Sequence, residues 1–322
     1  MTKHYQTWPF NFGAIHHQDF KKSKIAILPV PYEGTASFNG GARNGPYAII
    51  GNSRYLDELF DSHGDDLVGL KSTDIFTLDE LELSAGSPKE AIMGVEQAIG
   101  DEILKFNKIP LMLGGEHSIT FGAVSALRKK YPDISVLQLD AHADLIDEYV
   151  GTKYSHACVM RRIKELGVKT VQVGIRNMNA EIKQYLKEKN DLKIYYAPKV
   201  PAAADVIKSL SKNVYLTIDL DVFDPSIMPS TGTPEPGGLG WYDVVGLIEK
   251  VAKSKNIVGA DVVELSPIPG QIAPDFLAAK LAYKIINFLL EKKEILQDVS
   301  KKNFDGQELK SELEQDLPPE KK

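Results

Sequence analysis

The residues best suited to chemistry in this sequence lie between Asp140 and Asp144, in the order Asp-Ala-His-Ala-Asp. They directly follow the apolar run 136–139, which is typical of a buried strand. On extended backbone, residues at i, i+2 and i+4 point to one face, so the two carboxylates and the imidazole of His142 can share a metal ion. Ligand sets rich in carboxylate favour manganese or magnesium over the metals that prefer thiolates.

Two further motifs carry metal-capable side chains after apolar runs of their own. Asp219 and Asp221 follow the run 214–218, and His117 ends a Gly-Gly-Glu-His motif that follows the run 111–113. In open α/β sheets, ligands bind at the carboxyl ends of the strands. A single Asp at such a place is typical of a turn or a helix cap, and a single His of a core residue. Together, the three motifs predict a site for two divalent ions.

The three motifs resemble the signature blocks of the ureohydrolases, the family that contains arginase, agmatinase and formiminoglutamase. The resemblance extends from about residue 25 to about residue 290. It implies a binuclear manganese site, with nickel as an alternative metal, in which a bridging hydroxide hydrolyses a guanidino group to urea and an amine. Carried over by position, the implied metal ligands are His117, Asp140, His142, Asp144, Asp219 and Asp221.

The charge of such a site favours a cationic substrate independently of the family. Four aspartates balance two divalent ions, and an added hydroxide makes the site negative. A guanidinium stays protonated at physiological pH and is a poor electrophile. Two ions that share a water lower its pKa and hold the resulting nucleophile beside the guanidinium carbon.

Two other residues receive catalytic roles from the resemblance. Glu264 ends the expected strand 258–264 and is implied to pair with the guanidinium, a partner that suits the geometry of a carboxylate. His156 lies twelve residues after Asp144 and is implied to shuttle protons to the leaving amine, a task that suits an imidazole. The alternatives are a helix cap or a surface acid for Glu264 and a structural role for His156.

The loops, and not the metal ligands, must select the substrate. The segment 231–239 resembles its agmatinase counterpart, and the acidic Asp147 and Glu148 would favour an ammonium over a carboxylate. We therefore expect agmatine to be hydrolysed to putrescine and urea, a step of polyamine biosynthesis. Guanidinobutyrate, guanidine or another guanidino compound is the alternative, since Lys153 could serve an anionic tail. Asp147 and Glu148 could equally be plain surface acids.

Two hypotheses from other classes compete with this one. A metal-dependent deacetylase shares the broad architecture, but usually needs one zinc ion and fewer ligands. A non-catalytic relative would be expected to have lost ligands, and all six positions are kept here. The glycine-rich segment 32–46 could roof the pocket or be a surface connection.

The elements that must position these residues alternate along the chain. Strands are expected at 25–30, 109–113, 135–140, 170–175, 193–196, 214–219 and 257–265, and helices between them include 89–107, 119–131, 180–189 and 242–254. This repeated alternation predicts an α/β fold of three layers, αβα, with a mainly parallel central sheet. We expect an N-terminal extension over 1–22, a catalytic domain over 23–291 and a charged, flexible tail over 292–322.

The composition is that of an ordinary globular protein. Of the 322 residues, 43% are hydrophobic and 25% charged, and the net charge is −6, which argues against nucleic acid as a partner. The single cysteine fits a reducing compartment. The first residues do not read as a signal peptide and no apolar run is long enough to span a membrane, so we expect a cytoplasmic protein. The expected partner is a cationic guanidino compound, and the resemblance implies a homo-oligomer, a trimer or a hexamer.

Overall fold

The computed structural model describes residues 7–56, 70–84, 86–189 and 191–291. Within these ranges, one sheet of eight strands runs in the order β2-β1-β3-β8-β7-β4-β5-β6, and every pairing is parallel. The strands are β1 (Ile25–Val30), β2 (Ile75–Thr77), β3 (Ile109–Gly114), β4 (Ser135–Leu139), β5 (Lys169–Ile175), β6 (Lys193–Tyr196), β7 (Asn213–Asp219) and β8 (Asn256–Val263).

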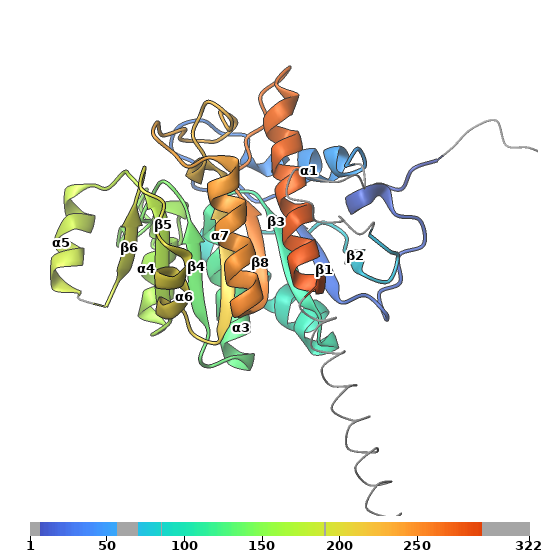
Figure 1. The fold of residues 1–322 in the computed structure, drawn as a ribbon, viewed down its shortest axis with the longest axis horizontal. Helices are drawn as coiled ribbons and strands as arrows, with labels where there is room; N and C mark the ends of the chain where they lie inside the picture. The colour runs from blue at the N-terminus through green and yellow to red at the C-terminus, as the bar shows by residue number, and fades with distance from the viewer. Residues whose placement is uncertain (1–6, 57–69, 85, 190, 292–322) are drawn as a thin grey trace, which may run out of the picture.

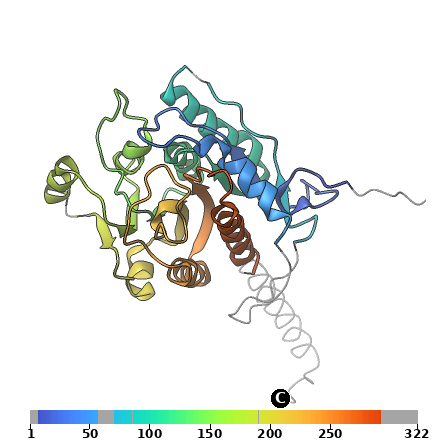
Figure 2. The ribbon, with the colours of Figure 1, turned by 90° about the horizontal axis from the view of Figure 1, so that it is seen from above.

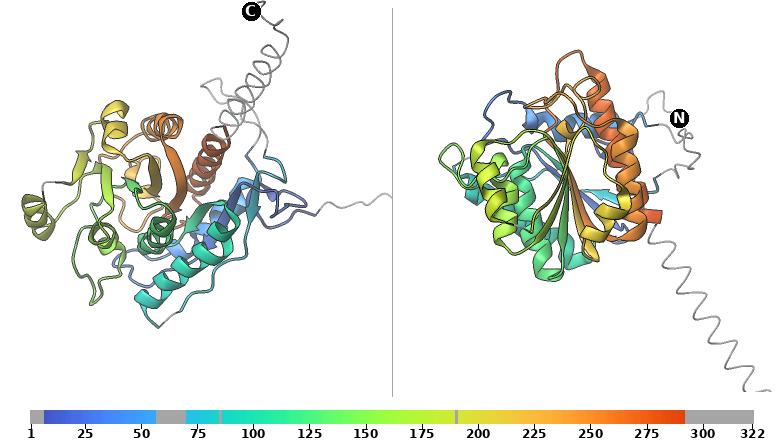
Figure 3. Two further views of the ribbon diagram at one scale, coloured as in Figure 1. Left: turned by 90° about the horizontal axis from the view of Figure 1, so that it is seen from below. Right: turned by 60° about the vertical axis from the view of Figure 1, so that its left-hand side comes forward.

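Helices cover both faces of this sheet, which confirms the predicted three-layer αβα fold (Figures 1 and 3). One face packs against α1 (Gly45–Ser53), α6 (Ala203–Ser209), α7 (Trp241–Ser254) and a helix over 272–291. The other face packs against α2 (Pro88–Ala98), α3 (Thr120–Lys130), α4 (Val159–Glu165) and α5 (Ala180–Glu188).

Alternation along each strand divides the core between these two faces. On β1, Ile25 and Ile27 join one buried cluster, whereas Ala26 and Leu28 join the other. Because both faces are covered, the central strands are mainly apolar, as parallel strands generally are, and their few polar residues, such as Gln138, Thr217 and Asp261, are buried. This double burial makes the strands easy to recognise in the sequence.

The order of the strands brings the predicted site residues to one edge. The neighbouring strands β3, β8, β7 and β4 carry the predicted site residues at or just beyond their carboxyl ends: His117, Glu264, the Asp219–Asp221 pair and the segment 140–144. In Figure 1 the loop that follows β7 lies at the top of the view, and Figure 2 looks down on this end of the molecule.

The structure adds one strand to the prediction. The three-residue β2 lies at the sheet edge beside β1, and the sequence does not predict it, since so short a strand has little periodicity. In the N-terminal segment, Phe12 is fully buried, whereas Trp8 and Phe10 are exposed. The predicted tail over 292–322 lies outside the described residues.

Candidate active site

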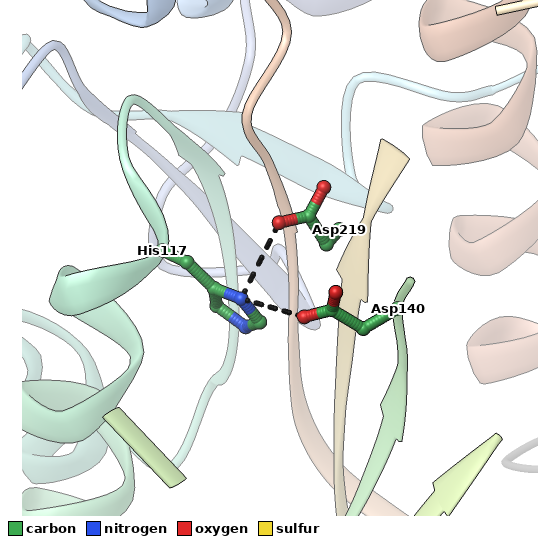
Figure 4. Close-up of side chains that lie close together, drawn as sticks. All are labelled: His117, Asp140 and Asp219. Atoms are coloured by element: carbon green, nitrogen blue, oxygen red, sulfur yellow. Dashed lines mark ion pairs between the residues drawn. The ribbon is translucent and has the colours of Figure 1, made fainter. Parts of the chain in front are cut away.

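His117 is the centre of the first group of site residues. It begins a short 3-10 helix after β3, and its Nδ1 atom lies 3.1 Å from Asp140, 3.0 Å from Asp144 and 3.5 Å from Asp219, each measured to Oδ2. Figure 4 shows the imidazole aimed between Asp140 and Asp219. Within the described residues, this buried Nδ1 has no hydrogen-bond partner. An imidazole nitrogen that faces three carboxylates without such a partner is placed as a metal ligand would be.

A second group of possible ligands shares Asp140 with the first. Nδ1 of His142 lies 2.8 Å from Oδ2 of Asp221 and 3.7 Å from Oδ1 of Asp140. In each group, the candidate ligand atoms lie within 4.8 Å of one another. The structure therefore brings all six residues predicted from the sequence into one small volume, and Asp140 is common to both groups.

The electrostatics of these groups favour bound cations. Burial, together with Asp144 and Asp221, raises the pKa of Asp140 to about 8. Burial and the charge of Asp221 also raise the pKa of Asp219 well above its usual range. Burial alone would lower the pKa of His142, but the carboxylates of Asp221 and Asp140 outweigh it and raise that pKa to about 11. Positive charge is needed here, and two divalent ions would supply it.

Hydrogen bonds fix the orientation of the same ligands. Nε2 of His117 lies 2.8 Å from the hydroxyl of Thr217, and the backbone N–H of His142 donates to Oδ1 of Asp140 at 2.5 Å. The carboxylate of Asp221 accepts from the backbone N–H of Ala141 at 2.9 Å. Metal ligands in proteins usually make hydrogen bonds of this kind to neighbouring groups. The candidate ligands, their burial and these hydrogen bonds therefore fit a pair of divalent ions.

The local backbone is shaped to place these side chains. A Cβ on Gly115 would lie 1.9 Å from the carbonyl oxygen of Tyr32, so only glycine allows the chain to pass there before His117. Asp144 and Glu264 adopt left-handed backbone with φ of 51° and 67°. Non-glycine residues in this conformation are strained, and strain of this kind gathers at functional sites.

Glu264 lies beside the metal-ligand candidates. Its Oε1 accepts the backbone N–H of His117 at 2.6 Å. Burial, followed by the neighbouring charge of Asp219, raises the pKa of Glu264 well above its usual range. A cation bound in front of this carboxylate would relieve both effects.

A cavity of about 230 Å³ opens above these residues. Its floor includes His117, His142, Asp219 and Glu264, and its wall includes Ala36, Ser37, Phe38, Asn39, Tyr149, His156, Asn177, Met178, Asn179 and Ile182. Residues 36–39 of the glycine-rich segment 32–46 thus form part of the wall of the cavity. Among the lining residues that the structure describes, none is a lysine or arginine.

His156 lies on the wall of this cavity, where the proton-shuttle role predicted from the sequence would require it. Its Nδ1 is 3.0 Å from the hydroxyl of Thr35, and its ring meets the Tyr149 ring edge-on, with 5.7 Å between the ring centroids. It is half-buried at the start of a short 3-10 helix.

The structure does not bring Asp147 and Glu148 to the cavity. The carboxylate of Asp147 pairs with Arg162 and lies 3.5 Å from Nζ of Lys153. Glu148 is exposed and is not among the lining residues. The pKa of Asp147 is lowered by its hydrogen bond to Arg162, so its charge is already neutralised locally.

Of the supporting residues around the ligands, Arg176 and Glu235 carry no recognisable signal in the sequence, whereas Asp224, directly before Pro225, is typical of a residue that fixes a turn. Arg176 donates from Nη2 to the carbonyl oxygens of Asp221 at 2.6 Å and of Glu235 at 2.7 Å, so it ties a ligand segment to the loop that follows it. The carboxylate of Glu235 lies 3.8 Å from Nε2 of His142. Asp224 fixes the turn after the ligand segment, because its carboxylate accepts the backbone N–H of Gly238 at 3.0 Å.

Comparison with known proteins agrees with this geometry. Residues 23–287 match the model of the arginase family. The N(1)-aminopropylagmatine ureohydrolase of Synechocystis is 35% identical over 84% of this chain and 90% of that protein, and the agmatinase of Pyrococcus horikoshii is 34% identical over 83% and 93%. The solved agmatine ureohydrolase of Thermoplasma volcanium superimposes with a TM-score of 0.73 at 32% identity, over 87% of this chain and 95% of that one.

The fold and the carboxylate-rich site define a metal-dependent hydrolase of the α/β class. More particularly, the chain belongs to the arginase family, and it is a ureohydrolase whose relatives include agmatinases. The family resemblance seen in the sequence is thereby confirmed. Its site residues form clusters compatible with a binuclear metal centre. None of the described helices has the length and apolar character that a membrane span requires.

Proposed function

We propose that this protein hydrolyses agmatine to putrescine and urea. The observation that carries the proposal is the position of Glu264, whose carboxylate lies at the floor of the cavity directly beside the six metal-ligand candidates. A guanidinium paired with this carboxylate would have its carbon next to the clustered aspartates. Bidentate pairing would also fix the plane of the substrate.

The proposed metal ligands are His117, Asp140, His142, Asp144, Asp219 and Asp221, and the proposed ions are two Mn²⁺, as the carboxylate-rich donor set favours. When bound, such a pair of ions lowers the pKa of a water molecule and supplies a nucleophile at neutral pH.

The protein's own side chains provide the remaining parts of the proposed reaction. Glu264 holds the guanidinium against the floor and compensates its charge. His156 lines the same cavity and would give a proton to the departing amine.

The outer wall supports an amine tail over a carboxylate tail. A carboxylate would need a cationic partner, and no lysine or arginine lines the described cavity. Lys153, which could have served an anionic tail, lies instead beside Asp147. Aromatic side chains on the wall, Phe38 and Tyr149, can face an ammonium favourably. Selection of the amine by Asp147 and Glu148 stays a prediction.

N(1)-aminopropylagmatine is the second candidate substrate. It is agmatine extended by an aminopropyl group, and the 35% identical Synechocystis protein is named for it. The cavity wall contains Met178, Ile182 and Phe38, which offer apolar surface to a longer methylene chain. Both candidates place the same guanidinium against Glu264, so they differ only at the outer wall.

A substrate panel tests the proposal. Urea release would be measured with manganese, then with nickel, from agmatine, N(1)-aminopropylagmatine, arginine, 4-guanidinobutyrate and guanidine at equal concentration. One of the two amine-terminated compounds should lead. A lead for guanidinobutyrate or guanidine would overturn the assignment but leave the family unchanged, and no urea from any compound would indicate a non-catalytic relative.

The same panel tests the two loop acids. Replacing Asp147 with Asn and Glu148 with Gln together should narrow the advantage of agmatine over guanidinobutyrate by at most about fivefold, because exposed charges are worth only about 0.2–1 kcal/mol. An unchanged ratio would show that the two acids do not select the substrate.

A further inference from the structure

The hydroxyl of Thr35 bridges two side chains that are far apart in the sequence. It lies 2.9 Å from Oε1 of Glu116 and 3.0 Å from Nδ1 of His156. Thr35 and Glu116 are buried, and His156 is half-buried on the cavity wall. A carboxylate, a hydroxyl and an imidazole therefore form one continuous chain of hydrogen bonds that ends at the substrate cavity.

The direction of this chain follows from counting protons. The carboxylate of Glu116 meets four donors: the backbone N–H groups of Gly34 at 2.8 Å and Thr35 at 2.7 Å, and the hydroxyls of Thr35 and Ser118. A hydroxyl has one proton to donate. Because Thr35 gives its proton to Glu116, its oxygen must accept from His156. It also accepts the backbone N–H of His156 at 3.2 Å.

We propose that Thr35 and Glu116 are positioning residues that hold His156 in the tautomer with its proton on Nδ1. Nε2 of His156 then carries the lone pair when the ring is neutral and is the atom that exchanges protons in the cavity. A neutral imidazole that is free in water can place its proton on either nitrogen, and the partner of one nitrogen decides which.

The same carboxylate also shapes the cavity. By accepting the backbone N–H groups of Gly34 and Thr35, Glu116 anchors the segment whose next residues, Ala36 to Asn39, form part of the wall. Glu116 directly precedes His117 in the chain. The metal-ligand segment, the wall and the imidazole are thus tied to one buried group.

A double-mutant cycle tests the inference through the rate, and to that extent it rests on the proposed function. Thr35→Val keeps the shape but removes the hydroxyl, and should lower kcat by about 10–100-fold, the usual cost of losing a supporting hydrogen bond of this kind. Thr35→Ser should restore most of the rate. In the His156→Ala background, Thr35→Val should have no further effect, because the group on which it acts is gone.

Ser118→Ala is the matched control. It removes another hydroxyl from the same Glu116 oxygen, at 2.5 Å, and within the described structure that hydroxyl bonds to Glu116 and not to His156. Its effect on kcat should be the same with and without His156. If Thr35→Val lowered kcat equally in both backgrounds, or if Thr35→Ser were as slow as Thr35→Val, the inference would be overturned.

A second measurement does not depend on activity. The protein would be labelled with ¹⁵N-histidine, loaded with diamagnetic Mg²⁺ and studied by NMR at about pH 8.5, where an ordinary imidazole is neutral. Among the seven histidines, His156 is assigned by comparison with His156→Ala. We expect Nδ1 of His156 to carry the proton in the wild type and this preference to be lost in Thr35→Val. If Nε2 carries the proton in the wild type, the inference is overturned. If Nδ1 is protonated but no guanidino compound yields urea, the proposed function fails and the positioning role stands.

Discussion

The backbone N–H of His117 donates a 2.6 Å hydrogen bond to the carboxylate of Glu264, across 147 residues of sequence. In the opposite direction, the N–H of Glu264 donates to the carbonyl oxygen of Gly115 at 2.9 Å. These two bonds join the carboxyl ends of the neighbouring strands β3 and β8. The first metal-ligand candidate and the carboxylate proposed to hold the guanidinium therefore keep a constant separation, as a reaction between a nucleophile and a bound carbon requires.

Replacing Asp140 or Asp219 with Ala should remove bound metal and urea release together, because both carboxylates face the buried Nδ1 of His117. Metal content by mass spectrometry and the rise in melting temperature on adding Mn²⁺ would be measured. Wild-type protein should gain about 2.7 kcal/mol of stability when free metal exceeds Kd a hundredfold. The control is Asp205→Ala, an exposed site on α6. A variant that keeps full metal would contradict the proposed centre.

After removal of metal by chelation, the protein should become less stable relative to Asp140→Asn as pH rises. Burial and neighbouring carboxylates raise the pKa of Asp140 from 3.8 to about 8 in the folded chain. The stability that comes from holding this proton is complete below pH 3.8 and is lost as pH rises through about 8. Asparagine stays neutral throughout.

The measurement for this pH effect is the melting temperature of both chelated proteins between about pH 5 and about pH 9, the range that brackets the transition. The melting temperature of the Asn variant should rise relative to that of the wild type up to about pH 8, and the difference should level off above it. A constant difference would show that Asp140 ionises normally in the folded state. Added Mn²⁺ should restore the wild type most strongly at high pH, because metal binding requires the deprotonated ligand.

His156→Ala should lower kcat by about 10²–10⁴-fold if the imidazole transfers a proton in the reaction. Metal content should stay close to that of the wild type, because His156 belongs to neither group of possible ligands in the described structure. Parallel kinetics and metal analysis separate the two cases, and loss of metal in this variant would make His156 a structural residue.

Gly115→Ala should destabilise the protein by about 1–3 kcal/mol, because overpacking forces the backbone to shift. The new Cβ would lie 1.9 Å from the carbonyl oxygen of Tyr32, and the shift would displace the adjacent Glu116 and His117. Gly246→Ala on α7 is the control, since nothing lies within 4 Å of its Cβ position. That variant should gain about 0.5–1 kcal/mol, because alanine is the better residue in a helix interior. Urea denaturation of both variants measures the difference.

The strands, the layers and the six candidate ligands of this protein follow from its sequence. Parallel strands buried on both faces appear as short apolar runs, and the acidic or histidine residue that ends each run is local information. Once the strands are parallel, their carboxyl ends must share one edge, so the sequence alone predicts that Asp140, Asp219 and His117 meet. The short strand β2 is not predicted from the sequence, because three residues are too few to show a hydrophobic periodicity.

The neighbours that complete the site depend instead on tertiary packing. Asp147 follows the Asp-x-His-x-Asp motif closely in sequence, but Arg162 on α4 holds its carboxylate, and it does not line the cavity. Thr35 is distant in sequence and reaches His156 because Glu116 fastens its loop. Local sequence predicts which helices and strands form, because their hydrophobic periodicity is a local pattern. The contacts between loops depend on how those elements pack, and the periodicity of the sequence does not predict them.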